Sequence, residues 1–357
     1  MASSGSTKVV VIALACNFGI AVAKFTAAAL TRSSAMLSEA IHSLVDTSNQ
    51  ALLLYGIHRS QRPADARHPF GYSKELYFWS FVVAILLFSL GAGVSIYEGF
   101  QKLRHPHPIT SFAVNYIVLA VAMALEGYTA WRAITEFESH RGARSWLAAL
   151  RLSKDAALFT VLLEDLAAIT GLLIAFVGLL AVQFLGLQEA DAIASILIGL
   201  VLATVAIFMS IEIKGLLVGE AASPKVQAGL RKVLQNEIGP AGPLRAINEI
   251  RTMHLGPVDV LVAASVDAAD GVPAEELEAL TSQLERTIKK KFPEVRRLFI
   301  ETQSVDGHNA AVAAENSRQG SNKTVPAKKP TRRTKKKPAA AKAPANRKTS
   351  KSAKPQS

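Results

Sequence analysis

His42 and Asp46 are the side chains of this sequence best placed to do chemistry, because they lie four residues apart inside the apolar stretch SEAIHSLVDTSNQALLLYG. Four residues make about one helical turn, so the imidazole and the carboxylate would share one face of a helix. An ionisable group in a lipid-embedded helix costs about 2.5–3.5 kcal/mol, so such groups usually face a cavity that serves an ion pathway. Neutral imidazole and carboxylate together make half of a site for a divalent metal ion.

A second polar pair, Glu164 and Asp165, interrupts the apolar run VLLEDLAAITG. Adjacent residues lie about 100° apart on a helix, so the two carboxylates are not expected to point at the same spot. We prefer Asp165 as the ligand, because Ala168 and Gly171 mark the same broad face as thin enough for close helix packing.

These two pairs form a metal site only if their helices touch. His42, Asp46 and Asp165, with Glu164 or water, would then supply three or four nitrogen and oxygen ligands. Such a set suits zinc and also manganese, iron or cobalt. The alternative is that the acids are protonated or paired, and only hold helices together.

The elements that must position these residues are six apolar stretches, each long enough for the roughly 20 residues of helix that cross a bilayer. Half of the chain is hydrophobic, and its mean hydropathy is positive. The second, fourth and fifth stretches carry acids, which suits a bundle interior. The six stretches cover residues 9–30, 35–57, 76–100, 112–131, 156–184 and 193–218.

Basic residues follow the second and fourth stretches, between positions 59–74 and 132–154, and Lys8 precedes the first. This asymmetry predicts that both chain ends are cytoplasmic, with Lys102 and Arg104 as a discordant pair. The N-terminus lacks the features of a secretory signal, so we expect its apolar run to be retained as the first helix. Cys16 is the one cysteine, so neither a disulfide within the chain nor a cysteine zinc cluster is expected.

After residue 218 the pattern changes to that of a small α+β domain. The helix–strand–strand–helix–strand order fits a ferredoxin-like sandwich. From residue 307 the chain carries 14 Lys and Arg against one acid, with few large apolar residues, and it should stay disordered. The predicted elements of the α+β domain are helix 225–238, strands 247–255 and 258–266, helix 273–291 and strand 295–303. The predicted parts are thus an N-terminal tail at 1–8, a six-helix membrane bundle at 9–218, a cytoplasmic α+β domain at 219–306 and a basic tail at 307–357.

The chain resembles the cation diffusion facilitators over roughly 300 residues. The resemblance rests on Asn17, on SSAMLSEAIHSLVDTSNQ, on the loop DARHPFGYSKE, and on six helices followed by a cytoplasmic α+β domain. Members of that family exchange divalent metal for protons, and their second and fifth helices each supply two ligands. Carried over, these are His42 and Asp46, and then Asp165, whereas Val161 occupies the position of the fourth ligand.

The segment LLED is similar to that of the subgroup containing an animal mitochondrial zinc transporter, where the adjacent glutamate, here Glu164, would replace the missing ligand. The departure leaves ligand number and metal open. Asp65 and His68 match positions where some members hold an accessory metal, but His68 before Pro69 fits loop packing equally well. His254 is the only histidine at 219–306, so a metal site in this domain is expected to be absent or reduced. The main role expected of the domain is therefore to form a homodimer.

The resemblance implies efflux of a divalent cation, zinc first, by proton-coupled antiport, with no cofactor and no enzymatic activity. Manganese, iron, cobalt and cadmium are alternative cargoes. A membrane metalloenzyme would be expected to carry a His-Glu-x-x-His helix or a Ser-Lys or Ser-His pair, which this sequence lacks. A scaffold acting through the basic tail stays open, since a polycation meets anionic lipid or nucleic acid unspecifically. The tail resembles bacterial histone-like tails, so we expect a bacterial inner membrane.

Overall fold

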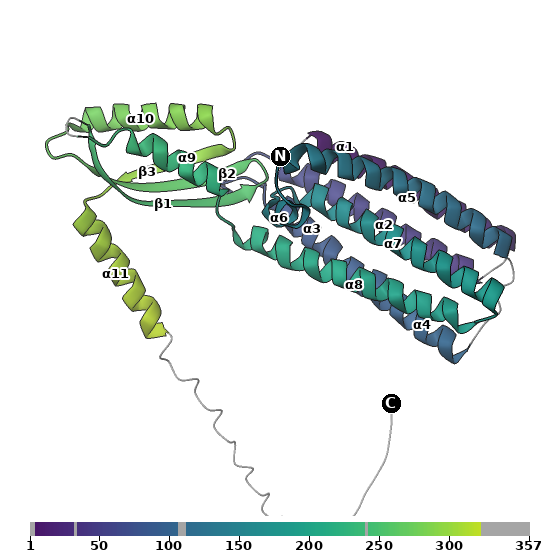
Figure 1. The fold of residues 1–357 in the computed structure, drawn as a ribbon. Helices are drawn as coiled ribbons and strands as arrows, with labels where there is room; N and C mark the ends of the chain where they lie inside the picture. The colour runs from purple at the N-terminus through teal and green to yellow at the C-terminus, as the bar shows by residue number, and fades with distance from the viewer. Residues whose placement is uncertain (1–3, 32–33, 106–111, 240–241, 323–357) are drawn as a thin grey trace, which may run out of the picture. The chain divides into compact units, whose positions relative to one another are not determined.

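The structure is a computed structural model and describes residues 4–31, 34–105, 112–239 and 242–322. Within these ranges, the side chains at 4, 31, 34–39, 41–42 and 319–322 lie outside the description. The N-terminal part is helical and the part after residue 223 combines helices with a sheet (Figure 1).

The N-terminal part is a bundle of long helices. The predicted stretch at 76–100 is one continuous run of α3, η1 and α4, in which η1 is a single π-helical segment. The short helix α6 between α5 and α7 was not predicted. The helices are α1 (Ser4–Thr31), α2 (Ser34–Ser60), α3 (Glu75–Leu86), η1 (Leu87–Ala92), α4 (Gly93–Arg104), α5 (Phe112–Arg141), α6 (Trp146–Leu152), α7 (Ala156–Leu185) and α8 (Glu189–Val218).

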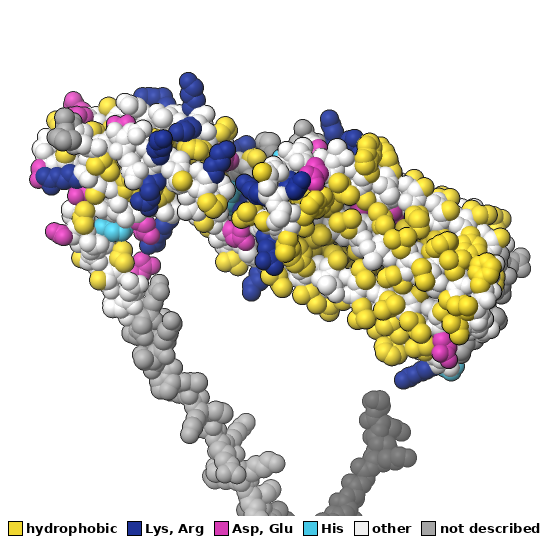
Figure 2. All heavy atoms as spheres, in the orientation of Figure 1, with side chains coloured by type: hydrophobic (Ala, Val, Ile, Leu, Met, Phe, Trp, Pro, Cys, Tyr) yellow, Lys and Arg dark blue, Asp and Glu magenta, His cyan; other side chains and the backbone are white. Residues whose placement is uncertain are grey.

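Five helices in the described ranges are apolar and long enough to cross a membrane: Gly5–Leu30, Glu75–Arg104, Phe112–Arg141, Ala156–Leu185 and Glu189–Val218. The sixth predicted stretch is α2, which is more polar than these five helices. It has 27 residues, about 40 Å of helix, and is therefore long enough to cross a membrane. It packs against α1, α3 and α7. The face of the bundle seen in Figure 2 is largely hydrophobic, and many large apolar side chains of its helices are exposed, as expected of helices surrounded by lipid.

The C-terminal part is an α+β domain with the predicted order of elements. Antiparallel β1 and β2 are followed by β3, which pairs in parallel with β2 after the crossover through α10. Helices α9 and α10 cover the same face of the sheet (Figure 1), and their apolar side chains form its core. Every boundary lies within three residues of its prediction, which confirms the fold class. The elements are α9 (Pro224–Gln235), β1 (Leu244–Gly256), β2 (Asp259–Ala268), α10 (Ala274–Lys291) and β3 (Val295–Thr302).

The start of the predicted disordered tail was wrong. The chain forms the helix α11 (Val305–Asn322), where disorder was expected from residue 307. The segment HNAAVAAEN is rich in alanine, the strongest helix former, and the Lys/Pro-rich composition begins only at Lys323. The rest of the predicted tail, residues 323–357, lies outside the described residues.

Candidate metal site

The first predicted ligand pair is carried by α2. His42 belongs to this helix, but its side chain lies outside the described residues. Asp46, one turn later, is half-buried, and its charge acts on Glu126 of α5 and on Glu164 of α7. The α2 side of the candidate site therefore faces carboxylates from two other helices.

The second predicted pair is carried by α7, which buries both acids. Glu164 is 6% exposed and Asp165 only 1% exposed. The side chain of Asp155 caps the start of this helix by accepting from the backbone N–H of Leu158, 3.2 Å away, and Gly186 ends it in the left-handed conformation. Caps at both ends define where α7 begins and ends, and the two carboxylates are held inside the bundle.

One hydrogen bond joins the two ligand-bearing helices directly. The side-chain amide of Gln50 in α2 donates from Nε2 to Oε2 of Glu164 in α7, at 2.7 Å in a buried position. The condition on which the sequence argument depended, contact between these helices, is therefore met. Gln50 lies one turn after Asp46, so this bond brings the α2 acid toward the α7 acids.

Glu126 adds a third helix to this acidic group, which we call the carboxylate cluster: Asp46, Glu126, Glu164 and Asp165. Glu126 interacts electrostatically with each of the other three carboxylates, Asp46, Glu164 and Asp165. Glu126 is the acid of the fourth predicted stretch, for which the sequence predicted only a position in the bundle interior. Several carboxylates in a low-dielectric interior repel one another, so they require protons or a cation between them.

A buried cation, Lys24 of α1, lies next to this cluster. It is 9% exposed, and its charge offsets that of Glu126. Helix α1 approaches α5 closely, since a Cβ added at Gly19 would lie 3.8 Å from the Leu125 side chain. Sequence reasoning missed Lys24, although a basic residue inside the first apolar stretch was a usable signal.

Several buried polar atoms around the cluster have no hydrogen-bond partner among the described residues. Folded proteins pair nearly all such atoms with protein groups, water or ions. Carboxylate and amide oxygens predominate, which are groups that coordinate cations. The atoms are Asn17 Oδ1, Asn49 Nδ2 and Oδ1, Gln50 Oε1, Thr160 Oγ1, Glu164 Oε1 and Asp165 Oδ2.

Within the described side chains, no three His, Cys, Asp or Glu residues form a ready-made metal-binding group. Asp46, Glu164 and Asp165 are all described and do not form such a group by themselves, whereas the side chain of His42 lies outside the described residues. The structure brings together the helices of Asp46, Glu164 and Asp165. Their assignment as metal ligands with His42 stays a prediction.

Asp65 and His68, the predicted accessory ligands, lie together in the loop between α2 and α3. Asp65 Oδ1 accepts from the backbone N–H groups of Arg67 and His68 at 2.9 and 2.7 Å, and Oδ2 accepts from the hydroxyl of Tyr72 at 2.6 Å. These bonds, led by that of Tyr72, lower the pKa of Asp65. The His68 ring packs on Tyr72 with centroids 4.2 Å apart. All of these contacts fit the loop-packing alternative, and the accessory metal stays a prediction.

His254 has the surroundings of a structural histidine. Its Nδ1 lies 3.1 Å from the carbonyl of Gly256, and its backbone N–H donates to the carbonyl of Glu220. Burial lowers the pKa of the ring, which favours the neutral form. These contacts are those of a side chain that packs at the end of β1.

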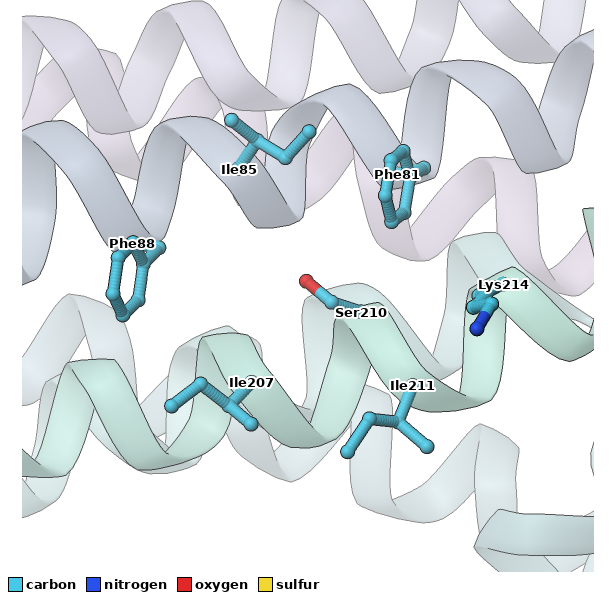
Figure 3. A pocket seen from close by; sticks show the side chains of 7 residues that line it. All are labelled: Phe81, Ile85, Phe88, Ile207, Ser210, Ile211 and Lys214. Atoms are coloured by element: carbon cyan, nitrogen blue, oxygen red, sulfur yellow. The ribbon is translucent and has the colours of Figure 1, made fainter. Parts of the chain in front are cut away.

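A cavity of about 350 Å³ between α3–η1 and α8 has different chemistry. Figure 3 shows mainly apolar side chains on both helices around it, with Ser210 and Lys214 from α8. It contains no carboxylate or imidazole that would bind a metal ion. The carboxylate cluster, and not this cavity, is the candidate metal site.

With this geometry established, comparison with known proteins defines the class. Residues 10–218 match the cation efflux transmembrane domain. The chain belongs to the cation efflux family, whose members are transporters of the membrane, and is an integral multi-pass membrane protein.

Among its relatives is the human protein named proton-coupled zinc antiporter SLC30A9, mitochondrial, which is 32% identical over 336 residues, covering 83% of this chain and 58% of that protein. Metal tolerance protein C4 of Arabidopsis thaliana is 32% identical over 266 residues, covering 73% of this chain and 57% of the relative. The metal cation efflux system protein CzcD of Cupriavidus metallidurans is 28% identical over 196 residues, 55% of this chain and 57% of the relative. The chain thus spans less than two thirds of the length of each.

Proposed function

We propose that this protein moves a divalent cation, zinc first, out of a compartment in exchange for protons. The observation that carries the proposal is the Gln50–Glu164 hydrogen bond, which joins α2 and α7 beside the two buried carboxylates of α7. The printed names of the relatives, a zinc antiporter and a metal efflux protein, support the same cargo and direction.

His42 and Asp46 of α2, with Asp165 and Glu164 of α7, are the proposed zinc ligands. A protonated imidazole or carboxyl must lose its proton to bind metal, so metal and protons compete for the same atoms. Metal entering from one side releases these protons, and protons entering from the other side release the metal. This competition couples the two flows when the bundle rocks between its two openings.

The cargo follows from the chemistry of the ligands. Two carboxylates, an imidazole and one further oxygen suit tetrahedral zinc, while manganese, iron, cobalt and cadmium are the competing cargoes of the same site. The bound ion and the carboxylates neutralise each other, which removes the repulsion within the cluster. None of these residues is assigned a catalytic role, and the protein is proposed not to be an enzyme.

The wider setting is also part of the proposal. The basic loops after α2 and α5 support a cytoplasmic position for both chain ends. The C-terminal domain is proposed to form the homodimer. The Lys/Pro/Ala-rich residues after 322 support a bacterial inner membrane and unspecific contact with anionic lipid or nucleic acid.

The test is zinc flux in liposomes containing the purified full-length chain, with a pH gradient as the driving force. Asp46→Asn and Asp165→Asn should each abolish flux. Asp191→Asn is the matched control. Asp191 lies at the far end of the bundle, where its Oδ2 forms an ion pair with Lys102 Nζ at 2.9 Å. Removal of residues 323–357 separates a transporter, which keeps its flux, from a scaffold that acts through its tail. Normal flux in Asp46→Asn would overturn the proposal.

A further inference from the structure

A second, polar cavity of about 320 Å³ lies where the end of α2 and the following loop meet the C-terminal domain. Its walls carry three arginines, Arg62 from the loop and Arg296 and Arg297 from β3, against one acid, Asp259. Its charge is therefore opposite to that of the carboxylate cluster. No metal ion would be attracted to it.

Arg297 and Asp259 form the rigid wall of this cavity. Arg297 Nη1 donates to Asp259 Oδ1 at 2.7 Å, and Asp259 Oδ2 accepts from the Ser73 hydroxyl at 2.9 Å. The guanidinium of Arg297 also lies over the Phe70 ring, 5.6 Å from its centroid. Because Asp259 is committed to these two donors, it does not neutralise the other arginines.

Arg62 and Arg296 differ from Arg297 in that their guanidinium groups are not paired with Asp259. Both side chains line the cavity and are exposed, and neither guanidinium makes a hydrogen bond or an ion pair with another described residue. The two therefore bring an excess positive charge into a concave space. Guanidinium groups bind phosphate oxygens through paired, charge-assisted hydrogen bonds.

The position of the cavity adds a second argument. It is also lined by Ser60, the last residue of α2, so it lies at the end of a helix of the membrane bundle. Phosphate headgroups of a bilayer occupy this level, where clustered basic residues attract anionic lipid. Phe70 offers an apolar surface beside the charged groups, which suits a substituted phosphate.

We propose that this cavity binds a phosphate group, held by Arg62 and Arg296, that bridges the loop between α2 and α3 to strand β3. The phosphate belongs to an anionic phospholipid headgroup or to a free phosphate anion. Either ligand would strengthen the contact between the bundle and the C-terminal domain. The proposal requires the membrane placement of the bundle and does not require that the carboxylate cluster carries zinc.

Thermal unfolding of the purified full-length chain in neutral detergent tests this. One series adds phosphatidylglycerol, with phosphatidylcholine as its control; another adds inorganic phosphate, with sodium chloride at equal ionic strength. Phosphatidylglycerol or phosphate should raise the melting temperature above its control. Stabilisation by phosphatidylglycerol alone identifies the lipid, and stabilisation by phosphate identifies the free anion.

The double variant Arg62→Gln/Arg296→Gln should bind the stabilising phosphatidylglycerol or phosphate about tenfold more weakly. This corresponds to the loss of roughly one charge-assisted hydrogen bond. The matched control is Arg231→Gln/Arg286→Gln, two exposed arginines of α9 and α10. The basic residues after 322 are present in every protein compared, so their contribution cancels. If the double variant does not fold, Arg62→Lys/Arg296→Lys keeps the charge and should bind more weakly than the wild type. No stabilisation by either ligand, or equal weakening in the control, would overturn the proposal.

Discussion

Two aspartates of this molecule are almost equally buried and have opposite surroundings. Asp259 in the C-terminal domain is 2% exposed and accepts from Arg297 and Ser73. Asp165 in the bundle is 1% exposed, has an oxygen without a partner, and faces the charge of Glu126. A buried acid whose partners are all supplied by the protein stabilises the fold. A buried acid that keeps one oxygen unpaired has an acceptor left over, which on the proposed function a metal ion would occupy.

Separate replacement of the two aspartates should give the largest difference between the two regions. Asp165→Asn should abolish zinc flux in liposomes and leave the melting temperature unchanged or higher, because it removes a repelling charge. Asp259→Asn should lower the free energy of unfolding by about 1–3 kcal/mol, because the partners of a buried acceptor lose it. Denaturant unfolding and flux, measured on both variants, check the pair. Loss of stability in Asp165→Asn with flux retained would reverse the two assignments.

Lys24 is a buried basic residue that lies beside the acids of the bundle. Its charge offsets that of Glu126, so on the proposed function Lys24 would compete with the metal ion for the carboxylate cluster. Lys24→Met should therefore lower the zinc concentration needed for half-maximal flux, by several-fold. Lys214→Met, which removes a lysine from the cavity in Figure 3, is the matched control and should leave that concentration unchanged.

The lysine prediction is contradicted if Lys24→Met requires more zinc for half-maximal flux. The same holds if the two lysine variants behave alike.

His254 provides a smaller effect in the C-terminal domain. Its folded pKa is lowered by burial, so below the unfolded pKa of about 6.5 the unfolded chain binds more protons than the folded one. Stability should be fully present above that pH and fall as the pH decreases through it. His254→Gln should flatten this part of the profile, measured as melting temperature between pH 7 and pH 5. An unchanged slope would rule out His254 as its source.

Asp65 should give the smallest effect. Its pKa is lowered in the folded protein, so its contribution is present at neutral pH, above the unfolded pKa near 3.9, and is lost as the pH falls through the folded pKa. Asp65→Asn should speed hydrogen exchange at Arg67 and His68 without reducing zinc flux. A large loss of zinc binding in this variant would instead support the accessory metal.

The sequence was most informative where the type of a residue contrasted with that of its neighbours along the chain. Asp46 and Asp165 stand out as acids in apolar stretches, and alternation of apolar residues predicted β1 and β2 within three residues. Lys24 was missed, and no role was predicted for Glu126 beyond a position in the bundle interior, because the roles of both residues depend on which helix faces of α1 and α5 meet. Tyr72 was missed for a similar reason, since its bond to Asp65 depends on how the loop turns.

The central claim is that metal and protons compete for the same ligands, and isothermal titration calorimetry of zinc binding measures this directly. Titrations of the full-length protein in buffers of different ionisation enthalpy give the protons released per zinc ion. We expect zinc binding to release protons from the wild type and from Asp191→Asn, and expect Asp165→Asn to lose both the release and the tight binding. Zinc binding without proton release, or unchanged binding by Asp165→Asn, would contradict the account.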